Sequence, residues 1–269
     1  MRHIVARLFR SGLTIREKVS SKLFKQVPCH HLTTSVFPAV SSYSTTMEKV
    51  CCHPPTLASI PGRYRSSLPP PATSLYSTAG KRLFDDARAQ GAAAGFLEIA
   101  TNLTTQSKLT YCGLSSLTTI LNALFIDPQH VWKGSWRWYD ETMLASDDIL
   151  KKADNDGLSF QDLVDLVPRD KVKLQATFAS ESSLPEFREH VLCSCSSDSS
   201  YILANFSRSM LGQTGKGHFS PIAAYNPTAD AVLILDVARF KYPPHWVPCS
   251  NFWESMSAIN PFTGKSRGY

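Results

Sequence analysis

Apolar residues recur at helical intervals in the middle of the chain. The clearest case is residues 113–125, where leucines lie three or four positions apart and the pattern ends before Pro128. Ser77 or Thr78 is a typical N-cap for an earlier helix through residues 80–90. The remaining predicted helices cover residues 92–103 and 158–167.

Strand character follows in the second half of the chain. Residues 232–235 are Val-Leu-Ile-Leu, a continuous apolar run that is typical of a buried strand. Because helices precede strands instead of alternating with them, the sequence predicts an α+β fold with an antiparallel sheet. The predicted strands are residues 172–178, 200–205, 218–225 and 231–240.

Residues 132–139 form an aromatic loop with three tryptophans and a tyrosine. Such rings either pack internally or offer a stacking platform for nucleic-acid bases. Residues 1–60 contain eight basic and two acidic residues, so they carry the whole net charge of +6 and the remainder is neutral overall. A neutral globular part excludes the electrostatic footprint of a nucleic-acid-binding protein, and internal packing is the expected role of most of these rings.

The first 46 residues are rich in Arg, Ser and Thr and nearly free of acidic residues. In a helix, the apolar residues among the first nine would share one face, which is typical of a mitochondrial targeting leader. A disordered, non-targeting tail is the alternative. Met47 offers a second start, which predicts an additional cytoplasmic form. Residues 47–67 are a Pro/Ser-rich connector, and residues 68–269 are the predicted folded domain.

The seven cysteines are an odd number without the density of a disulfide scaffold, which favours free thiols in a reducing compartment. Cys51-Cys52-His53 and Cys193-Ser-Cys195 could bind a soft metal ion. Neither has the CxxC spacing of a structural zinc site, so incidental thiols are the favoured interpretation. No apolar run approaches the roughly 18 residues that span a bilayer, and a protein without a membrane span is expected.

Cys112 begins the helix predicted over residues 113–125. Free amide groups and the helix dipole at such a position are expected to lower the pKa of a thiol and to favour a nucleophilic thiolate. Gln106 precedes it by six residues and could, with the backbone N–H of Cys112, form an oxyanion hole. The alternative is a cysteine that begins a core helix for packing alone.

Two further residues could complete a catalytic set with this thiol. His218 opens a predicted strand after a glycine-containing loop, where it could take the proton of a thiol and return it to a leaving amine. Asp236 lies within an apolar run and needs a partner, and an imidazolium is a suitable one. The alternatives are a surface histidine, and a structural ion pair of Asp236 with Arg208 or Arg239.

A series of short motifs occurs in a fixed order from about Leu68 to Tyr269. They are Thr105-Gln-Ser, Tyr111-Cys-Gly-Leu, Leu121-Asn-Ala-Leu, Ile126-Asp-Pro, Trp132-Lys-Gly, Trp136-Arg-Trp, Gln213-Thr-Gly, Gly217-His-Phe-Ser-Pro and Leu235-Asp-Val-Ala-Arg-Phe-Lys-Tyr-Pro-Pro-His-Trp-Val247. In order and spacing they resemble the catalytic domain of phytochelatin synthases, the glutathione γ-glutamylcysteinyltransferases. The resemblance implies a papain-like α+β fold, in which a helical part that carries the nucleophile packs on an antiparallel sheet.

The resemblance also implies a reaction. Members of the family cut glutathione at its Cys–Gly bond and hold the γ-glutamylcysteinyl group as a thioester. They pass this group to a second glutathione or a growing phytochelatin, commonly as a heavy-metal thiolate, in metal detoxification. By resemblance Cys112 is the nucleophile, His218 the acid and base, Asp236 its orienter and Gln106 the oxyanion donor. Expected substrate contacts are Tyr111, Gly113, Arg208, Gly217 and Arg239, with structural ion pairs as an equal alternative for the two arginines.

The resemblance implies no tightly bound cofactor and no metal ligands on the protein; ions of the Cd, Zn and Cu class are expected as activators in glutathione thiolates. Plant members carry adjacent cysteines where this chain has Ser146-Asp147, so metal sensing at that position is not expected. The family's Cys-rich C-terminal region does not follow Tyr269, which leaves a truncated or a short form, and members without it lean toward hydrolysis. A peptidase acting on glutathione or its S-conjugates and a non-catalytic metal-binding thiol protein stay open, as does a homodimer.

Overall fold

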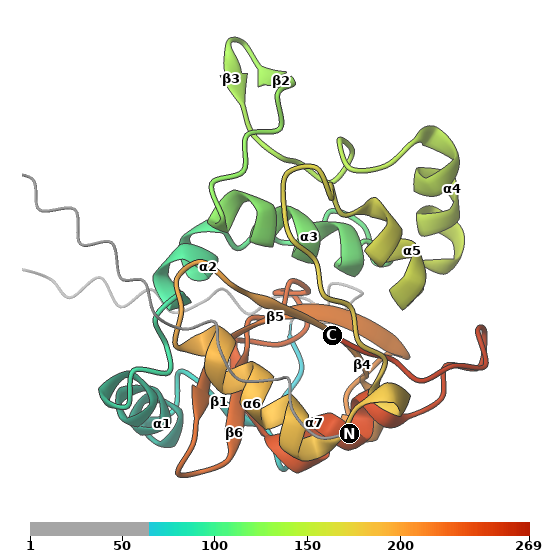
Figure 1. Cartoon of the computed structure of the whole chain (residues 1–269). Helices are drawn as coiled ribbons and strands as arrows, with labels where there is room; N and C mark the ends of the chain where they lie inside the picture. Colours follow the sequence, from blue (N-terminus) through green and yellow to red (C-terminus); the bar gives the residue numbers. More distant parts are fainter. Residues whose placement is uncertain (1–64) are drawn as a thin grey trace, which may run out of the picture. The chain divides into compact units, whose positions relative to one another are not determined.

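A computed structural model of the protein describes residues 65–269, in which a five-stranded antiparallel sheet has helices on both faces (Figure 1). This architecture confirms the predicted α+β class. The predictions for the leader, for Met47 and for most of the connector lie outside the described residues. In sheet order the strands are β1 (Thr73–Ser74), β7 (His245–Pro248), β6 (Ala231–Ile234), β5 (Gly217–Asn226) and β4 (Ile202–Ser207).

Seven α-helices and two short 3-10 helices occur in the described part of the chain. The α-helices are α1 (Thr78–Ala89), α2 (Phe96–Asn102), α3 (Cys112–Ala123), α4 (Asp147–Asp156), α5 (Phe160–Leu166), α6 (Leu184–Cys195) and α7 (Cys249–Ser257). The 3-10 helices are η1 (Ala179–Glu181) and η2 (Ser209–Leu211). No helix in this part is long and apolar enough to cross a membrane.

The sheet is covered on both faces, which explains the continuous apolar run in β6. Val232 and Ile234 pack into a core with α6 and α7, whereas Ala231 and Leu233 pack into a core with α1, α2 and α3. Alternate residues of a strand point to opposite faces, so a strand buried on both faces is apolar at every position. A further core joins α3 to α5 beside the sheet.

Helix ends follow the capping chemistry of the sequence. The Ser77 hydroxyl accepts a hydrogen bond from Gly80 N at 3.0 Å and begins α1, as predicted. Helix α6 was not predicted, although Ser183 and Glu186 form a capping box there and a proline occupies its first turn. Helices α4 and α7 and strands β1 and β7 were also missed, and α2 begins four residues later than predicted.

Two predicted strands differ from the structure. Residues 172–178 form no strand, because their antiparallel partners are limited to the last residues of the chain; Phe178 makes an isolated bridge with Gly268. The strand predicted to reach residue 240 ends at Ile234. Asp236 therefore follows the strand, and its Oδ1 accepts a hydrogen bond from Ala238 N at 2.8 Å, which turns the chain.

The aromatic loop forms the ribbon β2 (Val131–Lys133) and β3 (Trp136–Arg137), which projects from the end of α3 (Figure 1). The prediction that most of its rings are packed is wrong, because Trp132, Trp136 and Trp138 are 39 %, 75 % and 41 % exposed. A two-stranded ribbon has no second layer that could bury its side chains. Tyr139 is the buried ring of this segment, and its backbone bonds the Asn122 side chain.

Candidate active site

Helix α3 presses the start of its first turn against strand β5. A Cβ on Gly113 would lie 3.3 Å from Phe219 Cδ2 and 3.4 Å from Leu163 Cδ1, so glycine permits this close approach. The Ser116 hydroxyl donates to Phe219 O at 3.1 Å and fixes the helix on the strand. Cys112 is partly exposed, and its sulfur accepts from the backbone N–H of Phe219. The thiol is thereby held beside the residue that follows His218.

His218 and Asp236 meet as the sequence predicted. His218 Nε2 lies 2.8 Å from Asp236 Oδ1, and both side chains are buried. Because a charged carboxylate accepts hydrogen bonds, Nε2 carries the proton and Nδ1 is the free nitrogen of the neutral ring. Among the described residues Nδ1 has no hydrogen-bond partner, and the Cys112 thiol does not bond the ring in this structure. Such bonds commonly form only when substrate is bound.

Arg208 occupies the other side of Asp236. Its Nη2 lies 2.9 Å and 2.8 Å from the two carboxylate oxygens, and its side chain is 1 % exposed. The structural ion pair considered as an alternative for Asp236 therefore exists beside the pair with His218. Its Nη1 also donates to Gln213 Oε1 at 2.6 Å. Arg208 is therefore bonded within the protein interior, whereas the sequence predicted that it contacts the substrate.

The hydrogen-bond network continues beyond Arg208 to His245 of β7. Gln213 Nε2 and His245 Nε2 are 2.9 Å apart, and His245 Nδ1 lies 2.8 Å from Pro243 O. A carbonyl only accepts, so Nδ1 carries the proton of this ring and Nε2 accepts from the Gln213 amide. Each hydrogen bond of this network thus determines the orientation of the next side chain. Sequence reasoning noted the motifs with Gln213 and His245 but assigned neither residue a role.

The charges of this network set the proton affinities of the site. Burial alone would raise the pKa of Asp236, but His218, which is positively charged only at low pH, and the Arg208 cation outweigh burial and hold the pKa of Asp236 well below its usual range. Burial and the Arg208 cation lower the pKa of His218 to about 4. The imidazole is therefore neutral at physiological pH, in the state that accepts a proton.

The pKa of the Cys112 thiol differs from the sequence prediction. Burial raises the pKa of Cys112, and the amide of Phe219 and the cation of Arg208 offset only part of that effect. The predicted lowering at the start of a helix is wrong for this structure, because desolvation of the thiolate outweighs the favourable helix end. A nucleophilic role for Cys112 would therefore require a base to take the proton of its thiol.

Gln106 lies next to the catalytic candidates. Its backbone N–H donates to Val237 O at 3.0 Å, one residue after Asp236. Its side-chain Nε2 donates to Lys108 O at 2.7 Å, and its buried Oε1 has no partner among the described residues. An amide nitrogen has two hydrogens, so one remains for a substrate oxygen. The segment is further fixed by Glu141, which sequence reasoning did not identify and which accepts from Ser107 N at 3.1 Å and from the Ser115 hydroxyl.

The other predicted substrate contacts lie in different environments. Tyr111 is buried just before α3, with its hydroxyl 3.2 Å from Lys108 Nζ. Gly217 is exposed at the start of β5, and Arg239 is exposed after Asp236. Gly217 and Arg239 are therefore accessible to a ligand, whereas Tyr111 is packed.

The remaining described cysteines do not converge on a metal site. Cys193 is exposed while Cys195 and Cys249 are buried, and burial raises the pKa of each of these two thiols to about 12. Within residues 65–269 no group of three or more His, Cys, Asp or Glu side chains could hold a metal ion. Cys51 and Cys52 lie outside the described residues.

The antiparallel sheet, with a nucleophile candidate at the start of a packed helix and a His–Asp pair on the sheet, defines a papain-like α+β protein. Residues 63–269 match the sequence profile of a family described as phytochelatin synthase. The chain therefore belongs to the phytochelatin synthase family.

Curated relatives carry a matching name. Glutathione gamma-glutamylcysteinyltransferase 1 of Arabidopsis thaliana is 46 % identical over 207 residues, which are 77 % of this chain and 43 % of the relative. The transferase 3 of Lotus japonicus is 44 % identical over 209 residues, 77 % of this chain and 44 % of the relative. The Schizosaccharomyces pombe enzyme is 39 % identical over 207 residues, 77 % and 50 % respectively. The chain thus spans about half or less of these relatives.

Proposed function

We propose that the protein is a γ-glutamylcysteine transpeptidase, in which Cys112 attacks the carbonyl carbon of the Cys–Gly bond of glutathione. The attack forms a thioester, breaks the amide bond and releases glycine; a second glutathione or a phytochelatin then takes the acyl group through its amine. The observation that carries this proposal is the buried His218–Asp236 pair at 2.8 Å beside the start of α3. The names of the relatives support the choice of substrate.

The proton transfers of the first step follow from the pKa shifts of Cys112 and His218. The Cys112 thiol holds its proton because burial raises its pKa, so His218 Nδ1 takes that proton during the attack. The imidazolium then gives the proton to the nitrogen of the departing glycine. Asp236 stabilises the transient imidazolium and keeps Nε2 as the protonated nitrogen throughout.

Two donors are available for the oxyanion of the tetrahedral intermediate. The backbone N–H of Cys112 stands in the first turn of α3, where amide groups have no intrahelical partner. The second hydrogen of Gln106 Nε2 is the other proposed donor. Preorganised donors of this kind contribute about 3–4 kcal/mol each in other enzymes.

Heavy-metal ions enter the proposed reaction with the substrate. A Cd, Zn or Cu-class ion is a soft or borderline acid, and the thiolate of glutathione is its natural ligand. The metal–glutathione thiolate is then the acyl acceptor or donor, and the protein recognises the peptide part of it. The described residues present no metal cluster that would compete for the ion.

Mass spectrometry of the purified full chain, incubated with glutathione and cadmium, tests the proposal. Transpeptidation yields γ-glutamylcysteine oligomers and glycine, and Cys112→Ser abolishes both. Cys195→Ser, a buried thiol on α6, is the control that retains them. Formation of γ-glutamylcysteine alone would show that the chain is a peptidase. Unchanged glutathione would favour a non-catalytic protein. Either result would overturn the proposed transpeptidase activity.

A further inference from the structure

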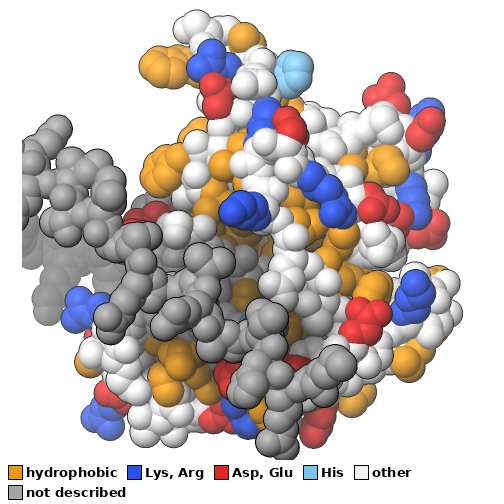
Figure 2. Space-filling model, viewed as in Figure 1, with side chains coloured by type: hydrophobic (Ala, Val, Ile, Leu, Met, Phe, Trp, Pro, Cys, Tyr) orange, Lys and Arg blue, Asp and Glu red, His pale blue; other side chains and the backbone are white. Residues whose placement is uncertain are grey.

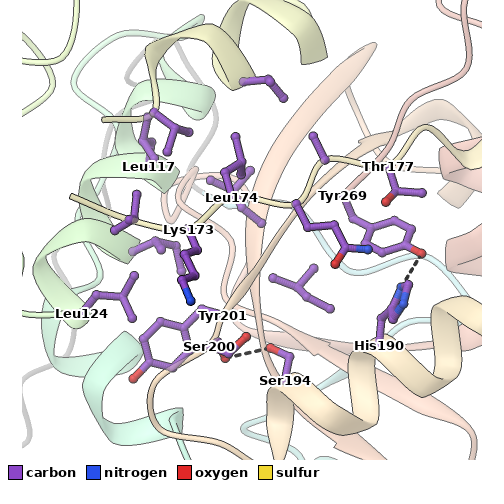
Figure 3. Close-up of a pocket in the computed structure, with 18 of the residues that line it drawn as sticks. Leu117, Leu124, Lys173, Leu174, Thr177, His190, Ser194, Ser200, Tyr201 and Tyr269 are labelled. Atoms are coloured by element: carbon purple, nitrogen blue, oxygen red, sulfur yellow. Dashed lines mark hydrogen bonds between the residues drawn. The ribbon is translucent and has the colours of Figure 1, made fainter. Parts of the chain in front are cut away.

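A pocket of about 670 Å³ lies along the C-terminal half of α3, away from Cys112, and contains none of the proposed catalytic residues. Its walls come from α3, α5, α6 and the start of β4, and residues 172–177 also line it (Figure 3). Figure 2 shows hydrophobic side chains between the α3–α5 layer and the lower part of the molecule, with lysine or arginine side chains next to them. This volume is in the range of small-molecule sites.

The walls are apolar along the helices. Leu117 and Leu121 of α3 and Leu124 at its C-cap form one wall, and the helical rise gives this wall a length of roughly 10 Å. None of the lining residues is Asp or Glu. A ligand with a long apolar body therefore fits the walls, and a cationic ligand would find no counter-charge in them.

Lys173 is the single lysine or arginine among the lining residues. It is exposed, and no hydrogen bond or salt bridge engages it in the described part of the chain. Figure 3 shows its amine pointing to the side of the pocket where Leu124 and Tyr201 lie. The pocket thus has a single unpaired cation at one end of an apolar wall.

Several other polar groups of the lining already have hydrogen-bond partners. His190 Nδ1 and Tyr269 Oη are 2.9 Å apart at the end opposite Lys173, as Figure 3 shows. The Ser194 hydroxyl donates to Ser200 O at 2.9 Å, and the Tyr201 hydroxyl donates to Asp198 O at 2.7 Å. A ligand therefore gains little from these groups, and Lys173 is the lining group that offers a positive charge to an anionic ligand.

We propose that this pocket binds an amphipathic monocarboxylate, a free fatty acid of medium chain length, with its carboxylate at Lys173 and its alkyl chain along the leucines of α3. Charge complementarity carries the choice: one unpaired cation, no acidic lining residue and apolar walls match one anionic group on an apolar chain. The proposal stands whether or not the chain is a transpeptidase, because the two sites share no residue.

Isothermal titration calorimetry of the full chain with dodecanoate, kept below its micellar concentration, tests the proposal. Saturable binding with one site per chain is expected. Butanoate, which has the same head group and a short tail, should give no binding. Dodecylammonium, which has the same tail and the opposite charge, should bind at least about tenfold more weakly.

Variants on the exposed segment separate the head-group contact from the tail contact. Lys173→Gln should weaken dodecanoate roughly threefold to tenfold, as expected for a partly exposed ion pair. Leu174→Asp should abolish measurable binding by placing a carboxylate in the lining. Both variants should fold, since the backbone of residues 173–176 makes no hydrogen bond within the described part. Leu192→Asp is the matched control, because Leu192 is 41 % exposed against 36 % for Leu174 and lies outside the lining.

Cys193 reports the location of the ligand, since its exposed thiol is part of the lining. Dodecanoate should slow alkylation of Cys193 by iodoacetamide and leave alkylation of Cys112 unchanged, as measured by peptide mass mapping. Absence of saturable binding would overturn the proposal, and so would binding that Leu174→Asp leaves intact. A concentration-dependent dimer that Leu174→Asp dissociates would assign the pocket to a second copy of the chain, which also overturns it.

Discussion

The two ends of α3 differ in what surrounds them. At the N-terminal end, Cys112 lies beside a buried network in which Arg208, Asp236 and His218 each have defined hydrogen-bond partners. Along the C-terminal half, Leu117 and Leu121 border a pocket with apolar walls and a single unpaired cation. The comparison shows that one helix can combine a hydrogen-bonded polar arrangement at one end with an apolar pocket wall along the other.

The polar end is organised for orientation more than for stability. Replacement of a buried ion pair by apolar residues is often neutral in other proteins, whereas removal of one partner costs about 3–5 kcal/mol. Asp236 has two such partners, and Arg208 lowers the proton affinity of the histidine that shares the carboxylate. The network therefore determines both the orientation of the His218 ring, the proposed base, and its pKa.

The largest effect is expected at His218. His218→Ala should lower glycine release from glutathione roughly 10⁴-fold, because members of such a catalytic set act as a unit. His130→Ala is the control, since His130 is exposed on the loop before β2. Activity of the His218 variant within tenfold of wild type would mean that the polar end of α3 is structural.

The next effect concerns the pH profile of Arg208→Met. Loss of the cation should raise the pKa of His218 above about 4, because Arg208 lowers it. The proposed base works in its neutral form, so the acidic limb of kcat/KM should move to higher pH. The free energy of unfolding should also fall by about 3–5 kcal/mol. Arg188→Met is the control, as Arg188 pairs with Asp230 outside the site, and it should leave the acidic limb in place.

Acid should destabilise the folded protein through His218. Its pKa is about 4 when folded and near 6.5 in the unfolded chain, so the unfolded state binds more protons as pH falls. The stability of the native state is therefore full above pH 6.5 and declines as pH falls toward 4. Urea unfolding at pH 7 and pH 4.5 measures this decline, and His218→Gln should reduce it. An equal decline in the variant would place the sensitivity elsewhere.

A matched pair of leucines tests the contrast in packing. Leu114→Ala removes a fully buried side chain near the polar end, and Leu121→Ala removes one that borders the pocket. Leucine truncation costs about 2–5 kcal/mol, depending on how tightly the surrounding side chains pack. Leu114→Ala should fall at the upper end and Leu121→Ala at the lower end, since the side chains around the pocket have room to move toward the volume that the truncation leaves. Equal losses in chemical denaturation would show that the pocket closes in solution.

The smallest effect is expected for Ser116→Ala, which removes the hydrogen bond from α3 to Phe219 O. The loss should be about 1 kcal/mol in the free energy of unfolding, because one buried neutral hydrogen bond is removed. Ser257→Ala is a control with a hydroxyl bonded within its own helix, and its loss should be smaller.

The sequence predicted the parts of the site that local chemistry determines. The leucine spacing placed Cys112 at the start of α3. The apolar run of β6 was predicted to continue through Asp236, whereas the strand ends at Ile234. Motif order then brought His218 and Asp236 together, and their 2.8 Å contact agrees with that prediction. Their catalytic roles stay predictions that the experiments above address.

Other features depend on long-range packing that no local pattern contains. The raised pKa of Cys112 comes from its burial in the folded protein, whereas the sequence shows only the favourable helix start. The ion pair of Arg208 with Asp236 joins residues 28 positions apart. From the sequence alone, this pair cannot be distinguished from a contact of Arg208 with a substrate carboxylate. The exposure of the tryptophans on β2 and β3 likewise depends on the absence of a covering layer in the described structure.

The central claim is that Cys112, activated by His218, carries the γ-glutamylcysteinyl group. Rapid acid quench of the full chain with glutathione, followed by peptide mass mapping, tests it directly. The account predicts a γ-glutamylcysteinyl adduct on the peptide that contains Cys112, formed together with one equivalent of glycine and absent in Cys112→Ser. Glycine release by Cys112→Ser at the wild-type rate, or an adduct on another residue, would contradict it.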